Sequence, residues 1–266
     1  MSTSPAPRSS VASPAGDDPG APVVTTPIVV AVDGPSGSGK SSVSRAVAAA
    51  LGVAFLDTGA MYRAVTWSAL QHGTDLADPA AVAEHVRAVA LRVGTDPAAP
   101  TVAVVAADGT ETDLTEAVRS AEVTSRVSAV ASVPAVRADL VLRQRAIIEA
   151  SCAAPAPGGR PGVVAEGRDI TTVVAPEADV RVLLTADEAV RLARRAQQDL
   201  GSDDAAALEA TRRAVVERDR VDARTTAFTA AADGVVTLDS THLDFEGTVA
   251  ALLDVVAAAR PVRGQR

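Results

Sequence analysis

Short continuous apolar runs recur along the chain and predict buried strands. The β-branched run 28–32, followed by Asp33-Gly34-Pro35, is typical of a strand buried on both faces of a parallel sheet. Similar runs follow later, and helical patterns separate them. Strands that alternate with helices in this way predict a parallel α/β sheet with right-handed crossovers. The predicted strands are 28–32, 53–56, 163–165, 180–184 and 235–238.

Apolar positions at helical spacing predict the helices between these strands. In 41–51, Val47 and Leu51 share one face, and Gly52 stands where a glycine commonly ends a helix. A proline can begin a helix, because its fixed φ suits the first helical position. Further helices are predicted from Pro134 onward, at 186–199 and 205–221, where arginine is frequent, and at 245–260.

The pattern changes between about 72 and 135. A hairpin is predicted at Asp108-Gly109, between 101–106 and 110–113, because an Asp-Gly pair favours a tight turn between two strands. An amphipathic helix carrying Val123, Val127 and Val130 follows. This region is typical of a subdomain inserted into the parallel sheet.

The two ends of the chain lack any apolar period. Residues 1–26 are mostly Ser, Pro, Ala, Thr and Gly, a composition that cannot bury enough surface to offset its conformational entropy. We therefore expect a disordered tail at 1–26, a single domain at 27–260 and a short tail at 261–266.

Composition excludes several classes of function. The 266 residues include 33 acidic and 25 basic side chains, for a net charge of -8, and only five aromatic residues. This balance argues against polymeric nucleic acid as a partner, since such partners select basic and stacking surfaces. No apolar run approaches the ~20 residues of a membrane span. The one cysteine cannot form an internal disulfide, so we expect a cytoplasmic protein without a membrane partner.

The basic residues contain one lysine, Lys40, and every other one is arginine. A GC-rich coding bias would replace surface lysines by arginine wherever either residue serves. The retention of Lys40 indicates a specific requirement for an ammonium group, although chance survival would give the same count.

A glycine-rich segment around this lysine fits the phosphate-binding pattern G-x-x-x-x-G-K-[ST]. It follows a predicted strand and opens a predicted helix, as the mechanism requires. Its backbone N–H groups can approach phosphate oxygens, the lysine reaches the β and γ oxygens, and the Ser41 hydroxyl can bind Mg²⁺. The predicted ATP-binding loop is Gly34, Pro35, Ser36, Gly37, Ser38, Gly39, Lys40, Ser41 and Ser42.

This loop alone leaves a GTPase switch, an ATPase and a small-molecule kinase open. Two further segments, Asp57 to Arg63 and Gly167-Arg168-Asp169, follow strands and should emerge at the same sheet edge. Arginine binds phosphate through two parallel hydrogen bonds, so Arg63 and Arg168 indicate a second phosphorylated substrate. Structural ion pairs are the alternative for both.

Together these segments resemble the bacterial cytidylate (CMP) kinases, which belong to the nucleoside monophosphate kinase group of P-loop kinases. The resemblance runs from about 28 to 258. The stretches that carry it are DGPSGSGKS, DTGAMYR, EVTSRVSAVASVPAVR, AEGRDITTVV, ERDRVD and AADGVVTLDST.

The resemblance implies a P-loop kinase fold with a five-stranded parallel sheet, a monophosphate-binding insertion at about 72–135 and a lid at about 190–218. It implies Mg²⁺-assisted transfer of the γ-phosphoryl group of ATP to CMP and dCMP, and we expect the protein to act as a monomer. Lys40, Arg63 and Arg168 would be catalytic, and lid residues Arg191, Arg194 and Arg195 would close over ATP. The implied CMP-binding residues are Thr58, Tyr62, Arg63, Ser128, Arg137, Arg168, Asp169, Arg218 and Asp222.

Within that set, the resemblance assigns different parts of CMP to different residues. Ser128, Arg137 and Asp169 would meet the cytosine edge, Asp222 would take the ribose hydroxyls, and the remaining residues would hold the CMP phosphate. The chain departs from the family pattern after Asp222, where it reads Ala-Arg-Thr-Thr-Ala-Phe. This leaves the role of Arg224 open.

Three acidic residues end predicted strands near the expected Mg²⁺ position. Asp33 and Asp57 could each hold metal-bound water or order the loop by hydrogen bonding, and Glu166 ends a third strand. A kinase for another small molecule, such as shikimate or gluconate, is the second reading, and a non-catalytic nucleotide switch is the third. A guanine-reading switch needs an N-K-x-D element, which the single lysine excludes.

Overall fold

The computed structural model describes residues 26–154, 159–222, 226 and 228–259, and it contains the predicted parallel sheet. All five strands lie within a few residues of their predicted positions, in the order β2-β6-β1-β7-β8. Residues 1–25 of the tail predicted at 1–26, and the tail predicted at 261–266, lie outside the described residues. The strands are β1 (Ile28–Asp33), β2 (Ala54–Asp57), β6 (Gly162–Gly167), β7 (Val180–Thr185) and β8 (Val236–Asp239).

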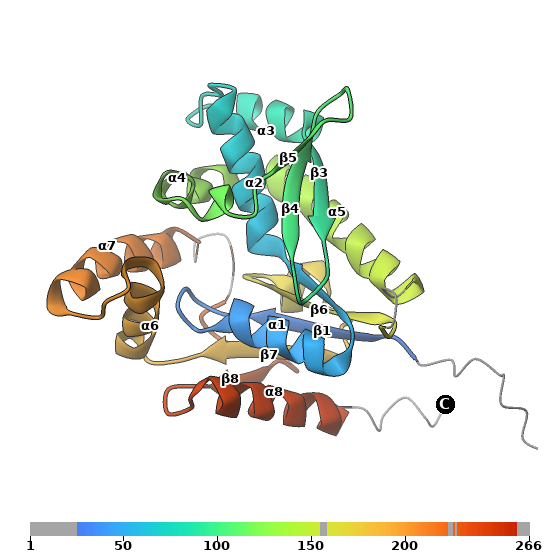
Figure 1. The fold of residues 1–266 in the computed structure, drawn as a ribbon, viewed down its shortest axis with the longest axis vertical. Helices are drawn as coiled ribbons and strands as arrows, with labels where there is room; N and C mark the ends of the chain where they lie inside the picture. Colours follow the sequence, from blue (N-terminus) through green and yellow to red (C-terminus); the bar gives the residue numbers. More distant parts are fainter. Residues whose placement is uncertain (1–25, 155–158, 223–225, 227, 260–266) are drawn as a thin grey trace, which may run out of the picture.

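The apolar runs form central strands because both faces of the sheet are covered. Helices α1 (Lys40–Leu51) and α8 (Phe245–Ala259) pack over one face, where Val47 and Leu252 are fully buried. Helices α2 (Thr58–Gln71) and α5 (Pro134–Ala153) cover the other face. The resulting three-layer arrangement confirms the predicted α/β class (Figure 1).

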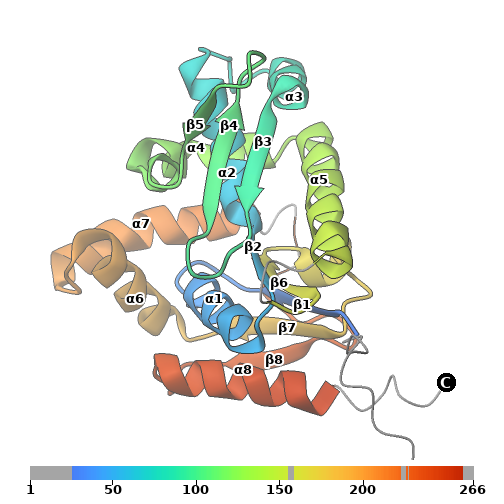
Figure 2. The same cartoon turned by 45° about the vertical axis from the view of Figure 1, so that its right-hand side comes forward.

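A second, antiparallel sheet lies above the first, as Figures 1 and 2 show. It contains the predicted hairpin, β4 (Thr101–Val105) with β5 (Glu111–Asp113), and a third strand, β3 (Ala90–Gly94), that the sequence pattern did not reveal. The structured elements around it are α3 (Pro79–Ala88), the short helical turn η1 (Ala117–Arg119) and α4 (Ala121–Ala131). These elements occupy the region predicted as an insertion.

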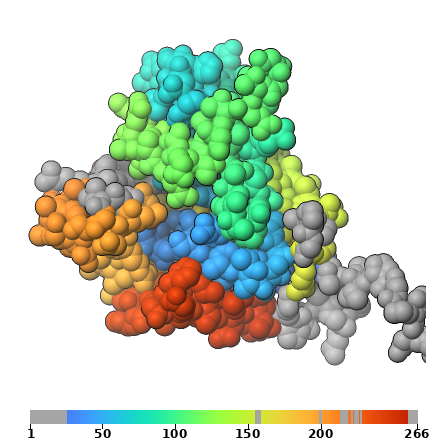
Figure 3. Space-filling model, viewed as in Figure 1, coloured from blue at the N-terminus to red at the C-terminus, as the bar shows by residue number. Residues whose placement is uncertain are grey.

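Two arginine-rich helices form a hairpin beside the main sheet. They are α6 (Glu188–Leu200) and α7 (Ala205–Asp222), which agree with the predicted helices. Helix α7 contacts α4, and α6 contacts the loop between β1 and α1 through Arg191. The space-filling view shows the hairpin as the orange projection beside the blue surface around α1 (Figure 3).

Candidate active site

The glycine-rich loop connects β1 to α1 at the carboxyl edge of the sheet. Gly37 and Gly39 have φ angles of 76° and 85°, a region that side-chain-bearing residues rarely adopt. A Cβ atom at Gly34 would lie 2.3 Å from the backbone oxygen of Leu184. The shape of this loop therefore depends on glycine at all three positions, and the loop opens α1 as predicted.

Lys40 and Ser41 begin α1, with Ser42 after them. The Lys40 Nζ atom lies 3.4 Å from the backbone oxygen of Pro35, so the ammonium group folds back over the loop. The Ser41 hydroxyl donates a hydrogen bond of 2.6 Å to Oε1 of Glu166, which ends β6. The loop lysine, the predicted metal-binding hydroxyl and a carboxyl group thus lie together.

Glu166 is buried, and its Oε2 atom has no hydrogen-bond partner among the described atoms. Burial, together with the neighbouring Asp57 carboxylate, raises the pKa of Glu166 to about 7, although the Lys40 cation opposes this shift. An unpartnered carboxyl oxygen beside a serine hydroxyl fits a hard divalent cation, which prefers oxygen ligands. Within the described residues, no group of three or more His, Cys, Asp or Glu side chains is placed to hold a metal ion.

The other two candidate acids order the backbone. Asp33 accepts hydrogen bonds from the backbone N–H groups of Ile170 and Thr171 at 2.8 and 2.9 Å and from the Thr171 hydroxyl at 2.6 Å. These bonds hold η2 (Ile170–Val174), a single wide helical turn that follows β6. Asp57 accepts from the N–H of Ala60 at 2.9 Å and so caps α2. Among the three acids, Glu166 is the one bonded to Ser41.

Arg168 and Arg191 meet at the phosphate loop. Arg168 Nη2 lies 2.9 Å from the Ser36 hydroxyl, and Arg191 Nη1 lies 2.9 Å from the Ser36 backbone oxygen. Both guanidiniums also contact Asp219, at 2.7 and 2.9 Å, and Arg168 lies 3.2 Å from Asp222. Arg168 therefore makes the ion pairs considered from the sequence as an alternative, and it makes them at the rim of the loop.

Asp219 was missed in the sequence. It lies in the stretch ERDRVD that carried the family resemblance, three residues before Asp222, and this position was its only signal. Its contact with the loop crosses 183 residues of sequence.

Two of the three residues predicted to meet cytosine, Arg137 and Asp169, contact each other. The Arg137 guanidinium from α5 forms an ion pair with Asp169, which follows β6. Burial raises the pKa of Asp169, and the Arg137 cation opposes this shift. Tyr62 is close enough for the Asp169 carboxylate to add to the effect of burial, which raises the pKa of Tyr62 to about 12. The Ser128 hydroxyl donates to Asp222 at 2.9 Å, which joins α4 to the end of α7.

Other predicted site residues have different partners. Arg63 contacts the backbone oxygen of Val118 at 3.2 Å and the Thr124 hydroxyl at 2.7 Å, both near α4. The Thr58 hydroxyl donates to the backbone oxygen of Glu166 at 2.7 Å, which ties α2 to β6. These side chains lie near α4 and β6, and their roles in binding the CMP phosphate stay predictions.

The arginines predicted to belong to a lid lie at different positions. Arg191 faces the phosphate loop, whereas Arg194 donates to the Ser240 hydroxyl at 2.9 Å and to the Leu243 backbone oxygen at 3.0 Å, in the loop after β8. Arg195 lies half-buried on α6. Arg218 lies on α7 with its side chain outside the described atoms, and Arg224 lies outside the described residues.

In the described part of the chain, every helix is too short or too polar to cross a lipid bilayer.

The candidate site lies at the carboxyl edge of the main sheet. The phosphate loop, the pair Arg168 and Arg191, and the pair Arg137 and Asp169 meet there.

Comparison with known proteins identifies relatives over nearly the whole chain. The family model described as cytidylate kinase matches residues 30–258. A cytidylate kinase of Streptomyces griseus is 45% identical over 234 residues, which cover 88% of this chain and 94% of that protein. A cytidylate kinase of Rhodococcus opacus is also 45% identical, over 237 residues that cover 88% of this chain and 96% of the relative. The chain belongs to the cytidylate kinase family.

Proposed function

We propose that this protein transfers the γ-phosphoryl group of ATP to CMP and dCMP. The observation that carries the proposal is the adjacency of Arg168 and Asp169. Arg168 contacts the phosphate loop, and the next residue pairs with Arg137, the residue predicted to meet the base. Two consecutive residues therefore connect a triphosphate-binding loop to a pair of groups suited to a cytosine edge.

The donor half of the site is the phosphate loop. Backbone N–H groups of Gly37, Ser38 and Gly39, the start of α1 and the Lys40 ammonium would hold the ATP phosphates. Ser41 and Glu166 are the residues that would hold Mg²⁺, Ser41 directly and Glu166 through water. Bound there, the ion would neutralise charge that develops on the phosphate oxygens.

The acceptor half would lie between α2, α4 and the end of β6. Arg63, Arg168 and Arg218 are the cations proposed for the CMP phosphate. Asp222, held by the Ser128 hydroxyl, is the group proposed for the ribose hydroxyls. A ribose without its 2′-hydroxyl would keep one of the possible contacts, so dCMP remains an acceptor in this proposal.

Cytosine fits the Arg137–Asp169 pair. Its N4 amino group donates, and its N3 and O2 atoms accept, so a carboxylate and a guanidinium complement its edge. Uracil reverses the groups at positions 3 and 4. Its O4 would face the Asp169 carboxylate, and its N3–H would face a group that only donates. The pair therefore favours cytosine.

Positioning and charge neutralisation supply the catalysis in this proposal. An attacking CMP phosphate oxygen is already anionic at neutral pH, so the reaction needs no strong general base. Lys40, Arg168 and Arg191 hold the two substrates in line and counter the repulsion between their phosphates. These roles match a site rich in cations and without a His–Asp dyad among its predicted residues.

A coupled assay of ADP release tests the proposal over CMP, dCMP, UMP, AMP, shikimate and gluconate. We expect CMP and dCMP to be the best acceptors, with kcat/KM for UMP lower by at least about 100-fold. Preferential phosphorylation of shikimate or gluconate would instead support the kinase for another small molecule. ADP release that does not depend on any acceptor would point to an ATPase.

We further propose that the protein acts as a monomer in the reducing cytoplasm, where its single cysteine needs no partner. Light scattering on the purified protein tests the first point. A mass of two subunits at micromolar concentration would overturn it.

A further inference from the structure

The Asp219 carboxylate accepts hydrogen bonds from three segments: the phosphate loop, the segment after β6 and helix α6. Its Oδ1 atom lies 2.7 Å from Arg168 Nη2 and 3.2 Å from the backbone nitrogen of Ser36. Its Oδ2 atom lies 2.9 Å from Arg191 Nη1. One carboxylate therefore joins α7, α6, the end of β6 and the phosphate loop.

These contacts hold two like charges beside each other. Arg168 and Arg191 bond to opposite oxygens of the same carboxylate, with side chains only 14–15% exposed. Without an anion between them, two guanidiniums at this separation would repel. Burial raises the pKa of Asp219, but the Arg168 and Arg191 cations favour the carboxylate. The pKa of Asp219 therefore stays below its usual value. Asp219 is thus ionised at any pH at which the kinase would work.

The backbone supports the same arrangement. A Cβ atom on Gly37 would lie 2.3 Å from the backbone oxygen of Arg191, so α6 approaches the phosphate loop at the glycine itself. The Arg168 guanidinium lies 4.2 Å from the centre of the buried Phe228 ring, which restricts its other side. The two cations are therefore fixed by contacts on several sides, and Asp219 is the charged group that both of them contact.

We propose that Asp219 is a positioning residue for phosphoryl transfer, which holds the guanidiniums of Arg168 and Arg191 side by side at the phosphate loop. This inference rests on the proposed function and deepens it. A pair of cations held in advance can neutralise charge on the transferred phosphoryl group without first reorganising. Asp219 itself touches neither substrate in this role.

The test measures kcat and KM separately for Asp219→Asn, with the acceptor that the wild-type protein uses best. The asparagine keeps the size of the side chain but not its charge. We expect kcat to fall by about 10- to 100-fold, while KM for ATP and for the acceptor change by less than about threefold. Because the assay uses the best acceptor of the wild type, a different acceptor from CMP overturns the proposed function but leaves this test intact.

A double-mutant cycle separates positioning from a general structural role. In an Arg191→Ala background there is no second cation to hold, and Arg168 keeps Asp222 at 3.2 Å as a partner. There, Asp219→Asn should lower kcat by less than about threefold. An equal loss in both backgrounds would overturn the proposal, as would a lower melting temperature with unchanged kcat.

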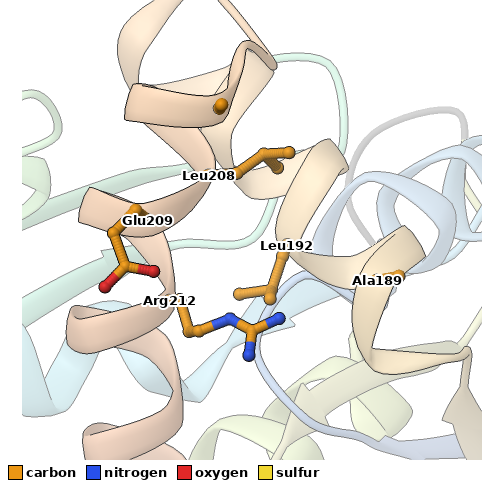
Figure 4. A pocket seen from close by; sticks show the side chains of 6 residues that line it. Ala189, Leu192, Leu208, Glu209 and Arg212 are labelled. Atoms are coloured by element: carbon orange, nitrogen blue, oxygen red, sulfur yellow. The ribbon is translucent and has the colours of Figure 1, made fainter.

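Glu209→Gln is the matched control because it removes the same charge from the same helix. Glu209 is exposed and lines a pocket between α6 and α7 with Leu192, Leu208 and Arg212, as Figure 4 shows. We expect its kcat to stay within about twofold of wild type. A comparable loss in this variant would mean that the charge of α7, and not the contact of Asp219, matters.

Asp219→Glu keeps the charge, and it serves as a second variant if Asp219→Asn does not fold. It should retain more of kcat than Asp219→Asn, since the carboxylate can still bridge two guanidiniums from a longer side chain. A gain in ATP affinity with normal kcat in either variant would instead mean that the carboxylate competes with phosphate, and would overturn the positioning role.

Discussion

At the scale of single residues, side chains of the same type perform different tasks at one sheet edge. Asp33 holds the backbone at Ile170 and Thr171, whereas Glu166 is bonded to Ser41 and keeps one oxygen without a described partner. The sequence placed both acids at strand ends but could not assign these tasks. The difference arises because each strand end faces a different neighbour in the folded sheet.

The only lysine gives the first test at this scale. Lys40→Arg should lower kcat by at least about 100-fold although the charge remains, because a planar guanidinium is too large to act as a point charge in the phosphate cradle. Steady-state kinetics with saturating ATP and CMP would measure the loss. Arg45→Lys, at an exposed position on the same helix, is the reciprocal control and should keep wild-type turnover.

Base recognition gives the second test. Asp169→Asn offers both an acceptor and a donor, so it should lower kcat/KM for CMP and narrow the ratio of kcat/KM between CMP and UMP. The substitution also breaks the ion pair with Arg137, so its melting temperature has to be measured alongside. A ratio that stays constant while CMP use falls would assign Asp169 to positioning Arg168 or Arg137.

The buried Glu166 predicts a pH dependence of stability. Burial raises its pKa from 4.5 to about 7, so the folded state binds this proton more tightly than the unfolded state. The stabilisation is complete below about pH 4.5 and is lost as the pH rises through 7. Between pH 4.5 and 8, the free energy of unfolding of the wild type should fall by up to about 3 kcal/mol more than that of Glu166→Gln. Urea unfolding of both proteins in Mg²⁺-free buffer would measure this difference. Parallel pH profiles of the wild type and Glu166→Gln would contradict the prediction.

At the scale of elements, the structure brings helix α6 directly onto the phosphate loop. Helix α6 meets the loop at Gly37, and α7 reaches it through Asp219. The helices themselves were predicted from the sequence, because their apolar spacing and length are local properties. Their position against the loop depends on contacts between residues that are more than 150 positions apart in the sequence.

Gly37→Ala tests the close approach of α6 to the phosphate loop. The added Cβ would meet the Arg191 backbone oxygen, so the helix or the loop has to move, and KM for ATP should rise by about 10-fold or more. Gly73→Ala is the matched control: its φ of 65° is equally unfavourable for alanine, but its Cβ would meet no atom within 4 Å. That variant should lose only about 1 kcal/mol of stability and keep its KM. An equal KM in both variants would contradict the close approach.

At the scale of the whole molecule, two sheets and a helical hairpin surround one site. The main sheet supplies the phosphate loop and the ends of β2 and β6, the upper region supplies Ser128 through α4, and the hairpin supplies Arg191 and Asp219. The Ser128–Asp222 bond joins the upper region to the hairpin. Movement of either part would therefore change the surroundings of Arg168, which contacts Asp222.

Removal of residues 1–26 tests the predicted boundary of the domain. Because their composition predicts no packed or phosphate-binding element, the shortened protein should match the full chain in melting temperature and in kcat/KM for CMP. Calorimetry and the coupled assay would check this. Loss of folded protein on truncation would move the boundary toward the N-terminus.

The sequence by itself determined the five parallel strands, the hairpin and the phosphate loop. Each of these follows from local chemistry: β-branched runs suit strands covered on both faces, an Asp-Gly pair suits a tight turn, and glycines permit the positive φ angles of the loop. Strand β3 was missed because its residues Ala90–Gly94 lack a long apolar run, and its pairing with β4 is what defines it.

Only the tertiary structure decided which site residues meet. The pairs Arg137–Asp169 and Ser128–Asp222, the placement of Arg194 on the loop after β8, and the position of Asp219 between two cations all depend on where distant elements pack. An acid or an arginine has the same appearance in the sequence whether it binds substrate, caps a helix or holds another charge. Its partner is set by burial and geometry across the fold, and sequence spacing carries no record of either.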